Sequence, residues 1–370
     1  MVPDVLIVGG GVIGCAIAYN LAKAGVRLLL IEKEGIASQA SGASAGMLDP
    51  MAEIGPGPLL ELGLKSLELF PSLTERLRED SGIDAGYYPA GLLSIARSEA
   101  EEEELKGRLN WQRERGLKAG WLTDKEVRGM EPALTPEVRG GIYYPDMAYV
   151  NPYRLTQALA QSAVRSGAEL RLGCKATGII TSGSRVLGVR LLNEEVRAGH
   201  VIIATGAYTG VWGEWLGPKL PIFPVKGQLM ALHKMPLILN HVVYAGHLGY
   251  LVPRRDGTII VGATQEDAGF DMKVTSGGLA HLSTLAERLV PGLKGAPFLR
   301  AWAGLRPGTP DGLPILGPLA DWRGLTIASG HFRKGILLAP ITGQIITSLL
   351  MEEAPALPLK PFLPDRFSQV

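Results

Sequence analysis

The sequence predicts an α/β protein of two interleaved domains, one built on a parallel sheet and the other on an antiparallel sheet. The chain has 370 residues, which is too many for one ordinary hydrophobic core. Its first 32 residues alternate an apolar run, a glycine-rich turn, a helical stretch and a second apolar run. Between residues 221 and 261, short apolar runs alternate with glycine and proline, which is typical of an antiparallel sheet.

The first of these patterns is that of a βαβ unit. Residues 5–8 and 28–31 are apolar runs typical of strands, and residues 12–24 have the periodicity of a helix. The chain enters the first run directly, without the basic and apolar regions of a signal peptide. We therefore expect a strand at this point and a cytoplasmic protein.

The turn between the first strand and the helix carries the pattern G-x-G-x-x-G. Gly9, Gly11 and Gly14 supply it, and glycine lets the backbone turn tightly and approach a pyrophosphate. Glu32 ends the second strand, where a carboxylate can accept hydrogen bonds from a ribose. The unit therefore predicts a Rossmann-like dinucleotide site, although these residues alone do not distinguish FAD from NAD.

Later segments divide between the two domains. Residues 99–115 are dense in charge, which suits a solvated helix outside the first core. Helical periodicity at 155–166 and a strand-like run at 201–204 return the chain to the first domain. A similar run at 325–328 precedes an apolar helix at 335–350. We predict a first domain of residues 1–85, 145–220 and 300–370, and a second domain of residues 86–144 and 221–299.

Composition and charge exclude several classes of function. A net charge of +1 provides no basic surface for nucleic acid. Cys15 and Cys174 have no paired spacing, so we expect reduced core thiols, and the six histidines show no metal-ligand motif. The apolar segment 335–351 is interrupted by Pro340 and is shorter than the ~20 residues that span a membrane. It indicates a buried helix rather than an integral membrane segment.

Seven segments along the chain carry a resemblance to a known family. They are, in order, residues 9–33, 41–48, 201–207, 224–227, 249–254, 302–308 and 330–337. Together they resemble the D-amino acid oxidase superfamily of FAD enzymes, and most closely the glycine oxidases associated with thiamine biosynthesis. The seven segments are spread over nearly the whole chain. An unrelated Rossmann protein would share the first of them and not the last four.

The resemblance implies that the first domain is an FAD-binding domain of the glutathione-reductase type, interleaved with an α+β substrate domain. In the related sarcosine oxidases a cysteine attaches the flavin just before a Thr-Pro-Asp segment, whereas Gly304 holds the corresponding position here. The resemblance therefore implies non-covalent FAD. The residues expected to contact it are Gly9, Gly11, Val12, Ile13, Gly14, Glu32, Lys33, Ala40, Ser41, Ala45, Gly46, Met47, Ala176, Gly206, Gly330, His331, Phe332, Arg333, Lys334, Gly335, Ile336 and Leu337.

The resemblance also implies a substrate site. Arg306 and Tyr250 would bind the substrate carboxylate, and Arg333 would approach both substrate and flavin. A guanidinium fork suits this task because it can pair both carboxylate oxygens. Without the resemblance, a structural ion pair for Arg306 and a sheet-core position for Tyr250 would be the simpler interpretations. His331 is expected either to pack or to take part in catalysis.

The implied reaction is the oxidative deamination of glycine, or of a related small amino acid such as sarcosine or a D-amino acid. Hydride transfer to the flavin would give an imine or 2-oxo acid and ammonia, and oxygen would yield hydrogen peroxide. The product would feed thiazole synthesis for thiamine. Relatives form tetramers, so a homo-oligomer is expected.

Two other functions remain open from the sequence. A dye- or quinone-linked dehydrogenase subunit for proline, sarcosine or a D-amino acid would share the fold. A non-catalytic redox sensor would need the glycine fingerprint but neither Arg306 nor Tyr250. Gln265 stands where relatives place an apolar pocket residue, so the sequence does not rank the substrates.

Overall fold

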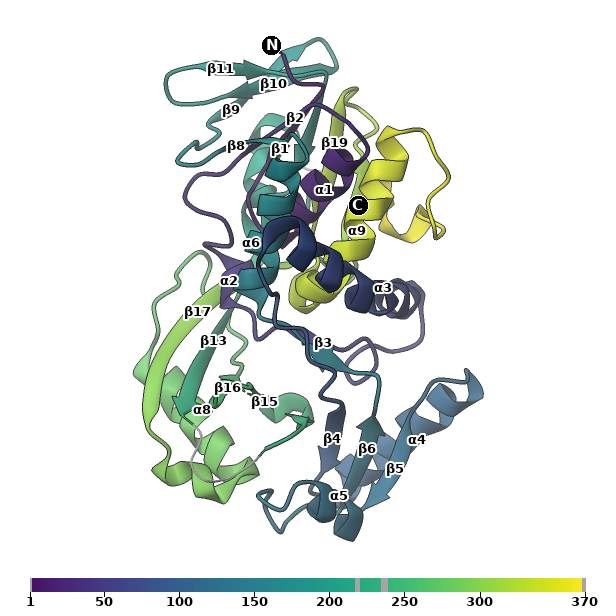
Figure 1. Cartoon of the computed structure of the whole chain (residues 1–370), viewed down its shortest axis with the longest axis vertical. Helices are drawn as coiled ribbons and strands as arrows, with labels where there is room; N and C mark the ends of the chain where they lie inside the picture. Colours follow the sequence, from purple (N-terminus) through teal and green to yellow (C-terminus); the bar gives the residue numbers. More distant parts are fainter. Residues whose placement is uncertain (1, 217–219, 234–238, 368–370) are drawn as a thin grey trace.

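The computed structural model describes residues 2–216, 220–233 and 239–367, and its two large sheets lie toward opposite ends of the molecule (Figure 1). One sheet has the order β18-β19-β12-β1-β2-β8. Its neighbouring strands are parallel, except that β18 is antiparallel to β19. The strands are β1 (Val5–Val8), β2 (Leu28–Ile31), β8 (Glu169–Arg171), β12 (His200–Ile203), β18 (Ile315–Pro318) and β19 (Leu325–Ser329).

This sheet is buried on both faces, because successive side chains of a strand point to opposite sides. Ile7 packs among the helices on one face, and its neighbour Leu6 packs against a small sheet of order β11-β10-β9 on the other. The helices are α1 (Val12–Lys23), α3 (Pro58–Ser81), α6 (Pro152–Arg165) and α9 (Gly335–Leu350). The small sheet consists of β9 (Gly178–Ser182), β10 (Arg185–Arg190) and β11 (Glu195–Arg197).

The second large sheet has the order β17-β13-β16-β15-β14-β4-β6-β5. Two 11-residue strands, β13 (Phe223–His233) and β17 (Phe298–Gly308), pair along their length and run from the junction of the two sheets (Figure 1). The other strands are β4 (Leu92–Ala96), β5 (Gly120–Thr123), β6 (Gly140–Tyr144), β14 (Val242–Tyr244), β15 (Tyr250–Pro253) and β16 (Thr258–Gly262).

Shorter elements complete the molecule. Around the second sheet lie α4 (Glu99–Glu114), α5 (Asp124–Met130) and α8 (Ser276–Leu289), and side-chain caps begin each of them. The remaining helices and strands are α2 (Ala40–Ala43), β3 (Met47–Leu48), β7 (Ala148–Tyr149) and α7 (Gly213–Leu216). The 3₁₀ turns are η1 (Gly206–Trp212), η2 (Gly246–Leu248), η3 (Pro291–Gly295), η4 (Phe332–Lys334), η5 (Lys360–Phe362) and η6 (Pro364–Phe367).

The predicted fold class is confirmed, with differences in three places. The 24-residue helix α3 was not predicted. The second sheet is not wholly antiparallel, because β14 pairs with β4 in parallel. Residues far apart in sequence form that pair, so no local pattern reveals its direction. The predicted domain limit at residue 300 falls inside β17, which belongs to the second sheet. We propose that this domain limit follows Gly308. The other domain limits remain as predicted from the sequence.

The apolar segment near the C-terminus forms α9, a core helix packed on α1 and α3. Among the described residues, no helix combines the length and the apolar character needed to cross a membrane. Cys15 is a buried free thiol as expected. The expectation of a core thiol is wrong for Cys174, which is partly exposed and lines the large cavity described below.

The close packing of α9 on α1 gives a first prediction. A Cβ on Gly343 would lie 2.5 Å from Asn20 Nδ2 and 2.7 Å from the carbonyl oxygen of Ala16. Gly343→Ala should therefore lower the free energy of unfolding, measured by urea denaturation, by about 1–3 kcal/mol. The matched control is Gly107→Ala in α4, where the added Cβ meets open space. It should raise stability by roughly 0.5–1 kcal/mol, and equal gains in both variants would contradict the packing argument.

Candidate active site

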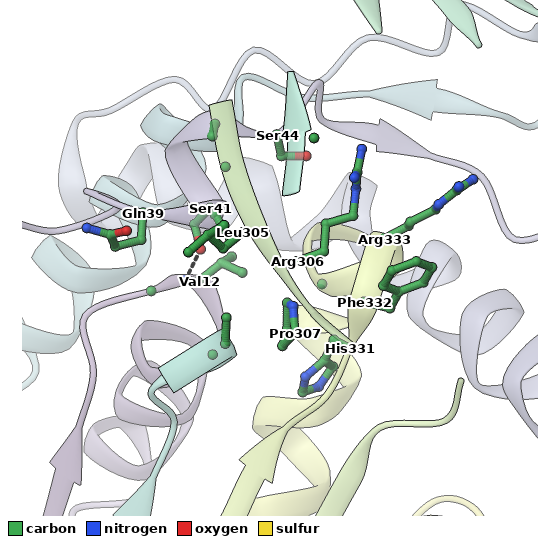
Figure 2. A pocket seen from close by; sticks show the side chains of 18 of the residues that line it. Val12, Gln39, Ser41, Ser44, Leu305, Arg306, Pro307, His331, Phe332 and Arg333 are labelled. Atoms are coloured by element: carbon green, nitrogen blue, oxygen red, sulfur yellow. Dashed lines mark hydrogen bonds between the residues drawn. The ribbon is translucent and has the colours of Figure 1, made fainter. Parts of the chain in front are cut away.

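A cavity of about 1430 Å³ opens at the carboxyl ends of the parallel strands and is lined by residues of both large sheets. Pockets for drug-sized ligands typically measure roughly 300–1,000 Å³, so this one can hold a larger molecule beside a small one. Figure 2 shows Val12, Gln39 and Ser41 together on one side of it, and Arg306 and Arg333 extending in similar directions on another. The two ends differ in chemistry.

One end is the N-terminus of α1. No side chain caps this helix at Gly11, and the backbone N–H of Val12 donates to Ser41 Oγ at 2.9 Å. Gly9, which has a positive φ, packs so closely that a Cβ would lie 2.5 Å from the carbonyl oxygen of Ala204. The positive end of the helix dipole therefore faces the cavity, an arrangement that favours a phosphate or pyrophosphate.

Glu32 lies beside this turn at the end of β2. It is nearly buried, and its two carboxylate oxygens accept hydrogen bonds from the backbone N–H groups of Gly10 at 2.7 Å and Glu34 at 2.9 Å. Both bonds fix the carboxylate in the cavity wall while leaving lone pairs free. Those lone pairs could accept hydrogen bonds from ribose hydroxyls.

Aromatic rings connect the two sheets across the same end. Lys33 Nζ lies 4.0 Å from the ring centroid of Tyr208, and that ring stacks on Phe270 with centroids 4.8 Å apart. Tyr208 belongs to η1, which follows β12 of the parallel sheet, whereas Phe270 follows β16 of the second sheet. All three side chains line the cavity. Only Lys33 was predicted, because no sequence pattern pairs rings so far apart in the chain.

Arg306 defines the other end. It lies on β17 opposite Val225 of β13, and its guanidinium packs directly on Gly227, where a Cβ would lie 2.3 Å from Nη1 and Nη2. Nη1 donates to the carbonyl oxygens of Lys226 at 3.3 Å and Thr264 at 3.2 Å. Burial lowers the pKa of Arg306, but arginine stays charged in proteins. A fixed cation therefore faces the cavity.

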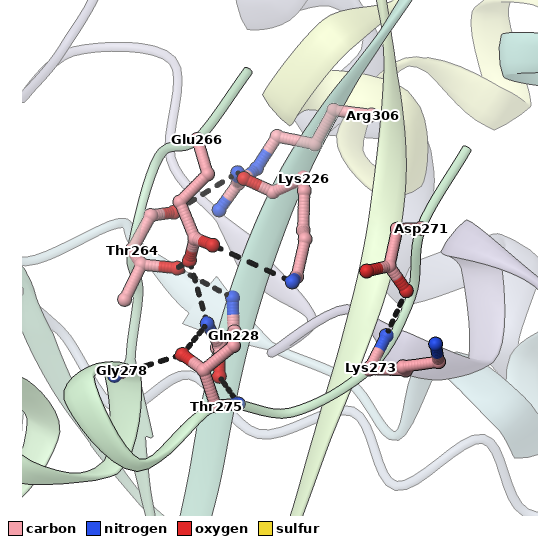
Figure 3. A network of polar contacts seen from close by, with 9 residues as sticks. All are labelled: Lys226, Gln228, Thr264, Glu266, Asp271, Lys273, Thr275, Gly278 and Arg306. Atoms are coloured by element: carbon pink, nitrogen blue, oxygen red, sulfur yellow. Dashed lines mark hydrogen bonds and ion pairs between the residues drawn. The ribbon is translucent and has the colours of Figure 1, made fainter. Parts of the chain in front are cut away.

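A polar network holds the two carbonyls that accept from Arg306 (Figure 3). At its centre is the Glu266 carboxylate, which accepts from the Thr264 hydroxyl and from Gln228 Nε2 at 2.7 Å. Lys226, only 2% exposed, places Nζ 3.4 Å from the same carboxylate. Burial favours a raised pKa for Glu266, but the hydrogen bonds from Thr264 and Gln228 and the charge of Lys226 outweigh it and lower the pKa. The network therefore carries an ionised carboxylate.

Tyr250 faces the cavity near Arg306. It pairs with Gly262 across β15 and β16, and a Cβ on that glycine would lie 2.6 Å from the Tyr250 hydroxyl. Burial raises the pKa of Tyr250, although the charge of Arg306 acts in the opposite direction. The phenol therefore keeps its proton and can donate a hydrogen bond.

Arg333 is held by side chains that the sequence analysis did not single out as partners. Nη1 lies 3.2 Å from Glu53 Oε1, and Nη2 donates to the side-chain oxygen of Gln265. Lys334 places Nζ 2.9 Å from the other Glu53 oxygen. Burial would raise the pKa of Glu53, but Lys334 and Arg333 lower it to about 2. Glu53 was missed because it follows no motif in the loop between β3 and α3.

The N-terminus of α9 also reaches the cavity, with no side-chain cap on the helix and with Gly335 and Ile336 in the wall. His331, just before it, is 3% exposed and shares a hydrogen bond of 3.0 Å with the Thr342 hydroxyl. Burial lowers the pKa of His331 to about 3. The ring therefore stays neutral near neutral pH, which supports packing over proton transfer. In the described part of the chain, His, Cys, Asp and Glu side chains form no cluster of three suited to a metal ion.

Most of the predicted site residues lie in the cavity wall. They are Gly9, Gly11, Val12, Ile13, Glu32, Lys33, Ala40, Ser41, Ala45, Gly46, Met47, Ala176, Gly206, Tyr250, Arg306, His331, Phe332, Arg333, Lys334, Gly335 and Ile336.

Three predicted residues are not part of that wall. Gly14 packs α1 against the turn that follows β1, because a Cβ on Gly14 would lie 2.0 Å from the carbonyl oxygen of Gly9. Gly330 has a φ of +80° and packs on Thr309, and Leu337 is 1% exposed in the helical core. Their neighbours in sequence face the cavity, but the turn geometry and helical periodicity direct these three residues elsewhere.

Comparison with known proteins supports one family. A model of the FAD dependent oxidoreductase family, DAO, matches residues 4–349. The chain is 38% identical over 362 residues to a glycine oxidase of Geobacillus kaustophilus (strain HTA426), covering 97% of this chain and 96% of that protein. It is 39% identical over 358 residues to the bifunctional protein ThiO/ThiG of Nostoc sp. (strain PCC 7120), covering 95% of this chain and 53% of that protein.

Comparison with solved structures shows the same similarity. The crystal structure of glycine oxidase from Geobacillus kaustophilus has a TM-score of 0.95 at 38% identity and covers 98% of both chains. The structure of L-proline dehydrogenase from P. horikoshii has a TM-score of 0.90 at 25% identity and covers 100% of this chain and 98% of that one. The fold is thus shared by proteins named as oxidases and as dehydrogenases.

The buried His331 predicts a dependence of stability on pH. Its pKa of about 3 lies below the ordinary value of 6.5, so the unfolded chain binds the proton more readily. The neutral His331 ring therefore stabilises the folded state above about pH 6.5, and this contribution to the free energy of unfolding is lost as the pH falls toward 3. His331→Asn should reduce the slope of unfolding free energy against pH, below pH 6, by up to about 1.4 kcal/mol per unit. Parallel profiles for the wild-type protein and His331→Asn would refute the argument.

Proposed function

Because this chain belongs to the DAO family of FAD dependent oxidoreductases, we propose that it oxidises a small amino acid, with glycine as the best substrate. One observation carries the proposal. Arg306 presents a fixed guanidinium beside Tyr250 in the same cavity that holds an uncapped helix N-terminus and Glu32. The first pair suits a carboxylate, and the second pair suits a dinucleotide.

The residues at the dinucleotide end fit FAD. The backbone at Gly11 and Val12 would face the pyrophosphate, and Glu32 would accept from the adenosine ribose. Ala176 and Lys33 line the wall next to Glu32, with room for the adenine. When bound, FAD supplies a two-electron acceptor. The N-terminus of α9, at Gly335, would stabilise negative charge that develops beside it.

The chain's own residues would act mainly by orientation. Arg306 would pair both oxygens of the substrate carboxylate, and Tyr250 would donate one further hydrogen bond. Such fixation places the Cα–H bond in one direction, and good orientation can contribute ~7–11 kcal/mol to a reaction barrier. His331 is neutral and engaged with Thr342, so no proton transfer through it is needed.

Finer assignments rest on the family resemblance. We propose oxygen as the electron acceptor, and imine or 2-oxo acid, ammonia and hydrogen peroxide as products. The similarity to one part of a bifunctional ThiO/ThiG protein supports a product that feeds thiazole synthesis for thiamine. We also propose that the enzyme is a cytoplasmic homo-oligomer, most simply a tetramer. The dehydrogenase alternative has the weaker similarity, at 25% identity.

A substrate panel tests the function directly. The purified protein should show flavin absorbance, consume oxygen with glycine and release an equal amount of hydrogen peroxide, with sarcosine and D-alanine as comparison substrates. Proline with an artificial electron acceptor is the control for a dehydrogenase. Reduction of that acceptor without any oxygen uptake would overturn the oxidase proposal. A protein without flavin absorbance would favour an NAD enzyme or a redox sensor.

Removing the guanidinium tests the substrate site. Arg306→Ala should lower kcat/KM for glycine by about 10²- to 10³-fold, mainly through KM, because a buried carboxylate would lose its charged partner. Flavin should stay bound. The matched control is Arg300→Ala on the same strand, where the side chain is exposed and packs on Trp302. If both variants keep wild-type kinetics, Arg306 has no role in binding the substrate.

A further inference from the structure

The substrate end of the cavity has an unusual concentration of charge. Three cations, Arg306, Arg333 and Lys334, stand near two carboxylates, Glu53 and Asp49. The nearby Lys226 and Glu266 pair with each other and cancel. Glu53 and Asp49 together match the charges of Arg333 and Lys334, which leaves the charge of Arg306 for a single substrate carboxylate.

Arg333 and Arg306 differ in how that charge is compensated. Arg333 pairs with Glu53 at 3.2 Å and also bonds to Gln265, whereas Lys334 takes the other Glu53 oxygen at 2.9 Å. Arg306 donates to two neutral carbonyl oxygens. Within the described residues, no carboxylate lies at ion-pair distance from Arg306. Of the two arginines among the described residues that line the cavity, Arg333 has an anionic partner and Arg306 has none.

The two guanidiniums line the same cavity. Arg306 and Arg333 extend in similar directions in Figure 2, and the charge of Arg333 acts on the pKa of Arg306. The charges of Arg306, Arg333 and Glu53 also influence the pKa of Tyr250. A substrate whose first carboxylate binds Arg306 would therefore bring a second carboxylate toward Arg333, where Glu53 already lies.

We propose that Glu53 determines specificity by neutralising Arg333, so that the site accepts amino acids with one carboxylate and rejects those with two. This inference rests on the proposed function, because it takes Arg306 as the carboxylate anchor. A second carboxylate would be desolvated beside an anion of the same charge, and rejection by like charge is a common source of selectivity. Glu53 is 12% exposed and so is poorly screened by solvent.

The test compares two ligands of nearly equal size, malonate and its monoamide malonamate, by calorimetric titration of the flavin-loaded enzyme. The titration is run above the second pKa of malonate. Wild-type protein should bind malonamate more tightly than malonate. Glu53→Gln should tighten malonate binding by about tenfold or more while changing malonamate binding by less than about threefold, because Arg333 gains a free charge.

Two further variants separate charge from structure. Glu53→Asp keeps the carboxylate and should restore the wild-type preference for malonamate. Glu195→Gln is the matched control, because Glu195 also lies near two cations, Arg190 and Arg197, but on β11 outside the cavity. It should leave both affinities unchanged. Flavin content and thermal unfolding of each variant verify the fold.

Three outcomes would overturn the proposal. The first is wild-type protein that binds malonate as tightly as malonamate, which needs no variant to observe. The second is an equal shift of both affinities in Glu53→Gln, which would make Glu53 a merely structural residue and leave the proposed function intact. Failure of wild-type protein to bind malonamate, together with failure to oxidise glycine, would instead refute the carboxylate site itself.

Discussion

The contact between the Arg306 guanidinium and Gly227 is the constraint on which the substrate end depends. The long antiparallel pair of β13 and β17 places Arg306 opposite Val225 and diagonal to Gly227, and the absence of a Cβ on Gly227 lets the guanidinium lie flat against the backbone. Two carbonyl oxygens then fix its orientation. A flexible arginine loses much entropy when it binds a ligand, so fixing it beforehand shifts that loss from binding to folding.

Holding a cation in this position requires further buried charge. Lys226 is almost fully buried, and its pairing with Glu266 keeps the carbonyls around Arg306 in place. Pairs of this kind rarely add much stability, because desolvation offsets their attraction. Their value lies in geometry: Lys226, Arg333 and Lys334 each have an anionic partner, whereas no described carboxylate pairs with Arg306. The fold thus leaves the charge of Arg306 available to a ligand, whereas these other cations are already paired with carboxylates.

The sequence predicted the dinucleotide end better than the substrate end, for a physical reason. Gly9, Gly11 and Glu32 act within one βαβ unit, so their spacing is fixed by local geometry. Glu53 acts on Arg333, 280 residues away, and Tyr208 of η1 stacks on Phe270 of the loop that follows β16. No local pattern encodes such pairs. Family resemblance found Arg306 and Tyr250, but only the fold shows that backbone carbonyls orient Arg306 and that Glu53 pairs with Arg333.

The two ends are joined by the packing of α1 on α9. Each helix follows a strand of the same parallel sheet, β1 or β19, and each presents an uncapped N-terminus to the cavity. Their close approach at Gly343 and Ala16 fixes one N-terminus relative to the other. The first suits a pyrophosphate, and the second suits negative charge formed during oxidation. Because one helix interface sets both dipoles, core packing far from Arg306 fixes the relative position of the two N-termini that line the cavity.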